Sequence, residues 1–249
     1  MQIPPPALRG SSVAPRNDNV ISFVVPAHNE EAYIGDTLRI LRASAEELGE
    51  PFEVIVVDDA STDRTAELAR ATGAIVHAVD RRQIAAVRNA GAGVARGDVL
   101  IFVDADTHVN AETMRQTMRA LAGGAVGGGA RFRFESGPRW SHALGAIVGL
   151  LMQRLSWAAG CYVFARRADF EAVGGFDERY FATEEIVLSR ALKRRGRMTI
   201  VPEPVVTSGR KAHLHGAGEL WRLTFSFLTR GRSVLRTRKA LRFWYDGRR

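Results

Sequence analysis

Asp104 and Asp106 stand one residue apart, directly after the apolar segment Val99–Val103. A short, continuous apolar run is typical of a buried strand, so both carboxylates should lie at its end. Burying them without partners would be costly. A divalent cation such as Mg²⁺ or Mn²⁺ would neutralise them, since it uses one or two protein carboxylates and shares other ligands with a diphosphate. The alternative is a solvated turn in which Asp106 and Thr107 cap the next helix, and the short pattern alone fits both interpretations.

Two further acidic pairs allow a similar choice. Asp58 and Asp59 follow the apolar segment Phe52–Val57. One could cap a helix beginning near Ser61, while the other accepts a hydrogen bond from a nucleotide base or ribose; a simply capped loop is the alternative. Glu184–Glu185 opens an amphipathic segment that ends near Gly196, where acidic residues also favour a helix start through the helix dipole.

Apolar and amphipathic segments alternate through the first half of the chain. Expected strands cover 20–25, 52–57, 74–79 and 99–103, with helices beginning near residues 29, 61, 83 and 111. This alternation predicts an α/β fold with a mostly parallel central sheet and helices on both faces. Such sheets bind ligands at the carboxyl ends of their strands, where both strand-following aspartate pairs fall.

The pattern changes after Gly123. A half-exposed strand over Ala130–Phe134 is expected first. A helix over 138–157, a strand over 160–166, a short helix over 167–173, a turn over 174–178 and a helix over 184–196 should follow.

Composition narrows the class of protein. A chain of 249 residues with 46% hydrophobic and 25% charged residues has room for one α/β domain, or a domain with a short appendage, and is not disordered as a whole. Cys161 is the single cysteine, which excludes an internal disulfide framework and fits a reducing cytoplasm. Residues 1–19 lack an apolar core segment, so we expect a flexible leader and no secretory signal.

Two segments suggest contact with a membrane or with the protein's own surface. The apolar run Ala143–Met152 is about half of the length that spans a bilayer, so a buried or interfacial helix is expected. Residues 219–249 carry nine Lys/Arg against two Asp/Glu, interleaved with aromatic and aliphatic side chains. They could form an amphipathic segment on an anionic membrane surface, or a terminal helix packed on the domain. Nucleic-acid binding is not expected, because no recognised binding fold accompanies the charge.

Six short motifs occur together in a fixed order. They are VPAHNEE (25–31), VDDASTD (57–63), AVRNAG (86–91), VDAD (103–106), GGFDE (174–178) and TEEIVL (183–188). In order and spacing they closely resemble family 2 glycosyltransferases of the GT-A fold, over roughly residues 20 to 210. The resemblance implies a metal-dependent transfer from a UDP- or GDP-sugar, with a nucleotide-sugar-binding half at 20–122, an acceptor-side half at 123–215 and a basic helical tail at 216–249.

The resemblance also implies roles for individual residues. Those expected at the nucleotide sugar are Pro26, Ala27, Glu30, Asp58, Asp59, Arg88, Asp104, Ala105 and Asp106. Within this set Asp58 or Asp59 reads the base, Arg88 suits a phosphate or a base carbonyl, and Asp104 contacts ribose. Asp106 is the implied ligand of the divalent cation, Mn²⁺ or Mg²⁺. His215 could add a second ligand or remain a solvated loop residue.

On the acceptor side, the residues implied are Gly160, Cys161, Gly175, Phe176 and Asp177. The family's acidic pair usually reads Glu-Asp, with its second member as general base, so the catalytic pair here is Glu184 and Glu185. Glutamate at 185 is a departure, because its side chain is one methylene longer. A single base fits an inverting displacement by an acceptor hydroxyl.

Other functions fit the sequence less well. The Gln-x-x-Arg-Trp signature of processive polymerising members is absent, which favours transfer of a single sugar to a glycan, a lipid carrier or a small metabolite. A non-catalytic sugar-nucleotide binder is an alternative because of Glu185. A phospho-acceptor receiver domain would carry its acidic pair after the first strand. A dinucleotide-binding oxidoreductase would need a Gly-x-Gly-x-x-Gly motif there. We therefore expect a cytoplasmic enzyme, which could lie peripherally on the inner face of the membrane.

Overall fold

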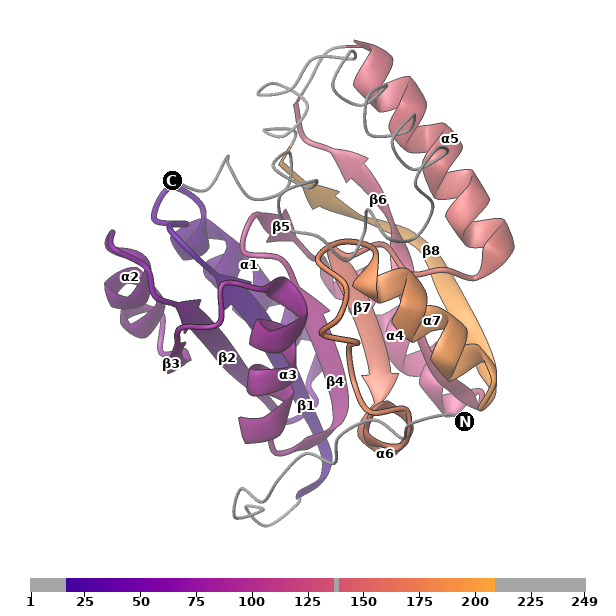
Figure 1. The fold of residues 1–249 in the computed structure, drawn as a ribbon, viewed down its shortest axis with the longest axis horizontal. Coiled ribbons are helices and arrows are strands. Elements are labelled where there is room, and N and C mark those ends of the chain that lie inside the picture. The colour runs from indigo at the N-terminus through magenta and orange to yellow at the C-terminus, as the bar shows by residue number, and fades with distance from the viewer. Residues whose placement is uncertain (1–16, 137–138, 209–249) are drawn as a thin grey trace.

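The computed structural model describes residues 17–136 and 139–208. Its centre is an eight-stranded sheet in the order β3-β2-β1-β4-β7-β6-β8-β5 (Figure 1). The strands are β1 (Asn17–Ala27), β2 (Phe52–Asp59), β3 (Ile75–Val79), β4 (Gly97–Val103), β5 (Thr107–His108), β6 (Ala125–Phe134), β7 (Tyr162–Arg166) and β8 (Arg197–Thr207). The helices of this part are α1 (Ile34–Leu48), α2 (Thr65–Ala71), α3 (Ile84–Val94), α4 (Ala111–Ala122), α5 (Arg139–Leu155), α6 (Arg167–Ala172) and α7 (Glu184–Lys193).

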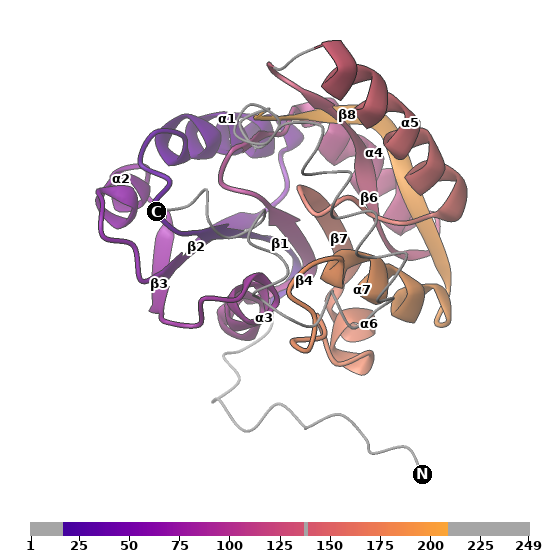
Figure 2. The same cartoon turned by 45° about the horizontal axis from the view of Figure 1, so that its top comes forward.

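The first half of the sheet is parallel, as the alternation predicts. β1 pairs in parallel with both β2 and β4, and β2 pairs in parallel with β3. β1, β2 and β4 are largely buried on both faces, which is why they read as continuous apolar runs, whereas the edge strand β3 is more exposed. Two hydrophobic cores cover the faces: α1, α2 and α4 contribute to one, and α3, α6 and α7 to the other (Figure 2). The predicted α/β class with helices on both faces is confirmed.

The second half of the sheet is mixed. β7 is antiparallel to both β4 and β6, whereas β6 and β8 are parallel. No strand was predicted at 197–207. Pro202 and Pro204 weaken the strand pattern there, because proline cannot donate a hydrogen bond to the ladder. The ladder shifts register between Ala130 and Phe132, close to these prolines. The two-residue strand β5, which pairs with the end of β8, was also not predicted.

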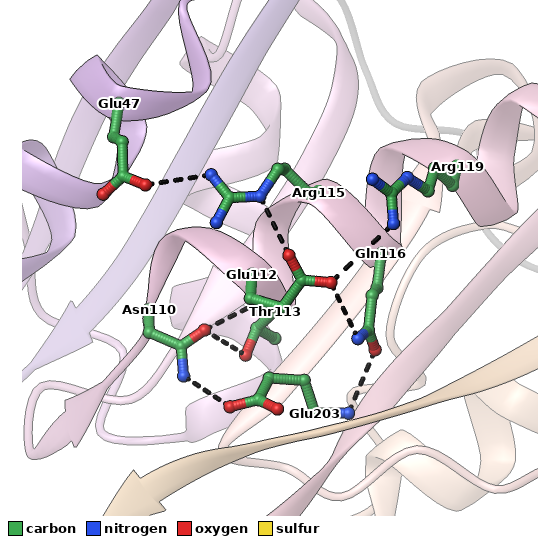
Figure 3. A network of polar contacts seen from close by, with 8 residues as sticks. All are labelled: Glu47, Asn110, Glu112, Thr113, Arg115, Gln116, Arg119 and Glu203. Atoms are coloured by element: carbon green, nitrogen blue, oxygen red, sulfur yellow. Dashed lines mark hydrogen bonds and ion pairs between the residues drawn. The ribbon is translucent and has the colours of Figure 1, made fainter.

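A polar network fastens β8 to α4 (Figure 3). Asn110 caps α4 by accepting a hydrogen bond from the backbone N–H of Thr113 at 2.8 Å, and its amide donates to Glu203 at 2.9 Å. The amide oxygen of Gln116 accepts from the backbone N–H of Glu203 at 3.0 Å. Arg115 extends the network to Glu47 at the end of α1. These contacts hold the carboxyl end of β8 beside the end of β4.

Close packing fixes α3 against the sheet. A Cβ added at Gly91 would lie 2.4 Å from Val24 Cγ1 and 2.7 Å from Val57 Cγ2, so only glycine allows this approach. Arg88 precedes Gly91 by three residues on the same helix. The contact of Gly91 with β1 and β2 therefore also fixes the backbone position from which the Arg88 side chain extends. The close approach of α3 to the sheet therefore sets the position of Arg88 relative to β1 and β2.

Some predicted features differ or fall outside the described residues. β1 begins at Asn17, three residues before the expected start of the catalytic domain. Most of the leader, and the whole basic tail at 216–249, lie outside the described ranges. Within those ranges, no helix has the length and apolar character needed to cross a membrane.

Candidate active site

The loops that follow β1, β2 and β3 meet at the carboxyl edge of the sheet. Ala27 and Asp58 are in register on neighbouring strands. Each loop contains one non-glycine residue in the left-handed region: Asn29 (φ 52°), Ala60 (φ 54°) and Arg82 (φ 52°). Such residues cost about 1–3 kcal/mol each and concentrate at functional sites. The carboxyl edge is therefore the strained part of the parallel half-sheet.

The first two of these loops are tied together. The backbone N–H of Asn29 donates to Ser61 Oγ at 3.0 Å, and Asn29 Oδ1 accepts from the N–H of Thr62 at 2.8 Å. The buried Glu30 donates its N–H to Thr65 Oγ1 at 2.7 Å. The segment after Asp59 was predicted to start a helix at once, but α2 begins only at Thr65. The intervening polar side chains brace the loop of the first motif.

The structure separates the two aspartates that end β2. Asp59 Oδ1 accepts hydrogen bonds from the backbone N–H groups of Arg81 (2.6 Å) and Arg82 (3.0 Å), so this side chain orders the loop before α3. Asp58 is buried, and its Oδ1 has no hydrogen-bond partner among the described residues. A buried acceptor without a partner is costly in the absence of a ligand. Asp58 is thus the better candidate to accept a hydrogen bond from a nucleotide base.

Arg88 lies at the centre of a buried ion-pair cluster. It is 2% exposed, and its Nη1 donates to Glu184 Oε1 at 2.7 Å. Its Nη2 donates to Asp104 Oδ1 at 2.8 Å and to the carbonyl oxygen of Gly160 at 2.7 Å. Burial lowers the pKa of Arg88 and the neighbouring carboxylates raise it, with a net rise, so the guanidinium stays charged.

These contacts give Arg88 a structural role beside its predicted place near the nucleotide. Both of its terminal nitrogens are bound by protein oxygens, and the guanidinium also stacks over the ring of Phe176 at 5.3 Å. The planar guanidinium bridges two carboxylates, the buried Glu184 and the partly exposed Asp104, and burying Glu184 without a cation would be costly. Arg88 is a positioning residue that connects the end of β4 to the start of α7.

Glu184 and Glu185 begin α7 from a strained backbone. Thr183, immediately before them, has φ 63°, which is unusual for a β-branched residue. Glu184 is buried against Arg88, whereas Glu185 is only half-buried. A Cβ added at Gly160 would lie 3.6 Å from Arg88 Nη2 and 3.8 Å from Glu185 Oε2, so Gly160 lies between these two side chains.

Burial raises the pKa of Glu185 to about 8, and the nearby charges of Glu184 and Asp104 add to the rise while Arg88 opposes it. A carboxyl group with such a pKa is largely protonated at neutral pH. Above that pKa it is a stronger base than an ordinary glutamate, and a pKa near the working pH is what general base catalysis requires.

Asp106 lies at the carboxyl end of β4, and Ala105 between the two aspartates is buried. Asp106 accepts from Ser208 Oγ at 2.5 Å, and its carbonyl oxygen accepts from the Ser208 N–H at 3.1 Å. Among the described residues no three of His, Cys, Asp and Glu gather into a cation site. One half-buried carboxylate fits a hard cation that takes its other ligands from a diphosphate and water. His215, the expected second ligand, lies outside the described residues.

The predicted acceptor-side residues do not all lie at one surface. Gly160 adjoins Glu185, and Cys161 follows it with a pKa raised by burial and by Asp104 and Asp106, so its thiol is not ionised. Phe176, however, is 1% exposed and packs in the core against Phe102 at 4.9 Å. Asp177 pairs with Arg179 at 2.7 Å. The ring of Phe176 therefore packs into the core, while the place of this segment on the acceptor side stays a prediction.

Two polar side chains of the α3 region hold the segment that contains this turn. Asn89 Oδ1 accepts from the Phe176 N–H at 2.9 Å, and its amide donates to the Phe176 carbonyl oxygen at 2.9 Å. Gln83 donates to the carbonyl oxygens of Glu178 (2.5 Å) and Tyr180 (3.0 Å). Neither residue was predicted to have a role. Asn89 lies inside the third motif, next to Arg88, and this position is the sequence feature that could have indicated one.

We expect Asn89→Ala to lower the free energy of unfolding by about 1–3 kcal/mol, because it leaves the backbone groups of Phe176 without partners. It should also reduce the turnover number more than the affinity for a donor, since the segment leads into Glu184 and Glu185. Chemical denaturation and steady-state kinetics measure the two effects. Asn110→Ala, which removes a comparable amide at α4, should affect stability alone; equal kinetic losses in both variants would contradict the assignment.

The arrangement has close counterparts among solved structures. The mannosyltransferase PcManGT from Pyrobaculum calidifontis, in complex with GDP-Man and Mn²⁺, superposes with a TM-score of 0.61 at 22% identity, covering 94% of this chain and 68% of that one. TarS 1–349 from S. aureus, in complex with UDP-GlcNAc, gives a TM-score of 0.55 at 21% identity, covering 76% and 56%. The fold and the carboxylates gathered at its carboxyl edge define a protein of the GT-A class.

Sequence comparison gives the family. The model of glycosyl transferase family 2 matches residues 22–183, and the chain belongs to this family. The undecaprenyl-phosphate 4-deoxy-4-formamido-L-arabinose transferase of Pseudomonas aeruginosa (strain LESB58) is 36% identical over 175 residues, which is 65% of this chain and 51% of that protein. This chain therefore spans about half of the length of such relatives.

Proposed function

We propose that this protein transfers a single sugar from a UDP- or GDP-sugar to an oxygen atom of a lipid acceptor, with inversion at the sugar. The observation that carries the proposal is the buried cluster in which Arg88 joins Asp104, at the end of β4, to Glu184 beside Glu185. Donor-side and acceptor-side carboxylates meet across this one cation. In the proposed division, residues 20–122 bind the donor and residues 123–215 face the acceptor.

On the donor side, Asp58 accepts a hydrogen bond from the base, and its unpartnered, buried oxygen supports this role. Pro26, Ala27 and Glu30 line the nucleoside pocket at the end of β1, and Asp104 contacts the ribose. Membership of glycosyl transferase family 2 supports a nucleotide sugar as the donor. The two structural counterparts carry GDP-Man and UDP-GlcNAc by name, and both are nucleoside-diphosphate sugars.

Asp106 is the proposed protein ligand of a divalent cation, Mn²⁺ or Mg²⁺, and His215 remains the predicted second ligand. Asp106 follows Asp104, the proposed ribose contact, by two residues. Its carboxylate would therefore lie near the diphosphate of a bound nucleotide sugar. A cation there neutralises the charge that develops on the departing nucleoside diphosphate. The hydroxyl of Ser208, which donates to Asp106, fixes the carboxylate from β8.

On the acceptor side, Glu185 takes the proton of an acceptor hydroxyl as its oxygen attacks the anomeric carbon. Arg88 has its terminal nitrogens bound to Glu184, Asp104 and Gly160. Since Asp104, Glu184 and Glu185 all lie around this one cation, whose terminal nitrogens are already bound, the described residues favour a neutral acceptor group over an anionic one.

A lipid phosphate is the second candidate acceptor. The Pseudomonas relative is named for undecaprenyl phosphate, and a phosphate oxygen is already ionised, so it needs no base. Such an acceptor would require a further cation, and Arg210 and Lys211, which lie outside the described residues, are candidates by sequence alone. Both candidates are lipids, and they differ in how strongly transfer depends on Glu185.

The proposal is tested by incubating the protein with radiolabelled UDP- and GDP-sugars, Mn²⁺ and a bacterial lipid extract, and counting label in the organic phase. Label in the lipid fraction, together with release of UDP or GDP, is the expected result. The proposal fails if no donor in the panel yields lipid-bound label above the protein-free control.

Changing a residue that only supports a metal ligand typically reduces activity by about 10–100-fold. Asp106→Asn changes the proposed ligand itself, so it should reduce this transfer by more than that. It should also abolish the increase in donor affinity on adding Mn²⁺, measured by calorimetry. The matched control is Asp98→Asn, which changes an aspartate near the opposite end of β4. Unchanged Mn²⁺ dependence in the Asp106 variant would remove Asp106 from the cation site.

A further inference from the structure

Helix α5 turns an apolar stripe to the outside of the molecule. Ile147, Leu150 and Leu151 are 66%, 57% and 55% exposed. They are spaced so that all three fall on one face of the helix. The opposite face packs on the sheet, since a Cβ at Gly145 would lie 2.9 Å from the ring of Phe134 on β6. Two views place α5 at the outer edge of the protein beside β6 (Figures 1 and 2).

The charged residues of α5 itself are all positive. Helix α5 contains Arg139 and Arg154 and no Asp or Glu. The exposed Arg154 falls on the same face as the three apolar residues. Lys193 of α7 donates to the carbonyl oxygen of Leu155 at 3.3 Å, so a second exposed cation lies at the carboxyl end of α5. Arg190, one turn earlier on α7, is a third exposed cation on that side.

We infer that this outer face of α5 is a docking surface for an anionic lipid bilayer. Apolar side chains that insert at the interface, with cations at their side and no acidic residue on the helix, are the features of an interfacial amphipathic helix. The cations attract anionic headgroups while the three aliphatic side chains enter the region beneath them. An uncharged partner would not require the cations.

The inference deepens the proposed function, because a lipid acceptor must be met at a membrane surface. The chain connects the surface to the site over a short distance: α5 ends at Leu155, and Gly160 beside Glu185 follows five residues later. The N–H of Ala158 donates to Ser189 Oγ of α7 at 3.0 Å, which fastens this connection to the helix that carries Glu185. Docking through α5 would therefore hold the acceptor side close to the bilayer.

The test measures hydrogen–deuterium exchange of the full-length protein with phosphatidylcholine vesicles that contain or lack phosphatidylglycerol, without donor or acceptor. We expect peptides from 145–155 to exchange several-fold more slowly with the anionic vesicles only, while peptides from α2 remain unchanged. The inference is overturned if the protein sediments with the vesicles and 145–155 exchanges as before, or if it does not bind them. It is also overturned if this segment is protected without lipid and loses protection on dilution, which would indicate a second copy of the chain.

Variants give a second readout. Ile147→Ser/Leu150→Ser/Leu151→Ser should lower the partition coefficient for anionic vesicles by about tenfold or more. Ile75→Ser/Val94→Ser changes exposed aliphatic residues on β3 and α3 and should have no effect. Thermal unfolding checks that both variants fold. Equal partitioning of the two variants would contradict the inference. Donor binding and transfer to a water-soluble acceptor should persist in both, so failure of the docking surface is distinct from failure of the proposed function.

Discussion

Glu185→Gln is expected to reduce sugar transfer to a hydroxyl acceptor by about 10²–10⁴-fold, which is the contribution of a general base. Donor affinity should remain nearly unchanged, because the proposed role of Glu185 is toward the acceptor and not the donor. For the wild-type protein, kcat/KM should rise with pH and level off above about 8, where Glu185 is ionised. The variant should lose this dependence. Initial-rate kinetics across the pH range provide the measurement.

The same substitution makes a prediction about stability that does not depend on the acceptor. Folding raises the pKa of Glu185 from its ordinary 4.5 to about 8, so the folded state favours the protonated carboxyl. The stability contributed by this group is complete below pH 4.5 and is lost as pH rises through 8. Glutamine resembles the protonated form. Glu185→Gln should therefore raise the unfolding midpoint relative to wild type more at pH 8.5 than at pH 5.

Two outcomes would be informative against this account. If transfer to a lipid phosphate persists in Glu185→Gln while its pH-dependent stability follows the prediction, the acceptor is the phosphate and Glu185 is not a base. If neither the rate nor the stability difference changes with pH, Glu185 is not in the environment described. Glu178→Gln, which changes a glutamate bound to Asn89 at the segment's surface, is a matched control for the kinetics.

Arg88→Met is expected to destabilise the protein by about 3–5 kcal/mol, because it leaves buried carboxylates without their cation. The side chain of Glu184 is only 6% exposed, so water would solvate its charge poorly in the folded state. Arg88→Met/Glu184→Gln should recover much of the loss, since it removes the uncompensated charge as well. Urea denaturation of the two variants and of Glu184→Gln gives the coupling energy between Arg88 and Glu184.

A structural role for Arg88 predicts more than lost stability. Without its charge, the pKa of Glu185 should rise further, since Arg88 opposes the effects of burial and of Glu184. The pH at which kcat/KM levels off should then move upward in any Arg88 variant that folds. Arg88→Lys should retain part of the charge effect but not the two-pronged geometry. If Arg88→Met unfolds as wild type does, the cluster does not hold the two halves together.

The sequence predicted the fold well where packing follows local pattern. The apolar runs before Asp58 and Asp104 are buried strands, and their carboxyl ends meet at one edge of the sheet. Hydrophobic periodicity sets both the strands and the helices that cover them. β8 was missed because its two prolines obscure a strand that tertiary pairing nevertheless stabilises between β6 and α4.

Side-chain partners were harder to predict than elements. Arg88, Asp104 and Glu184 lie 16 and 80 residues apart along the chain, and no local pattern indicates that they share one buried site. The choice between Asp58 and Asp59 also depended on which carboxylate accepts hydrogen bonds from the backbone of the loop before α3. The burial of the Phe176 ring was not predicted, because the GGFDE motif does not indicate which of its side chains packs into the core.

The central claim is that the carboxyl edge of the sheet binds a nucleoside-diphosphate sugar through Asp58 and Asp106. Thermal unfolding with UDP-, GDP- and dTDP-sugars, each with Mn²⁺ or with EDTA, tests it most directly. The account predicts that a UDP- or a GDP-sugar raises the midpoint, that EDTA removes most of the shift, and that Asp58→Ala and Asp106→Asn each reduce it. A midpoint that no sugar nucleotide changes, with or without Mn²⁺, would contradict the account.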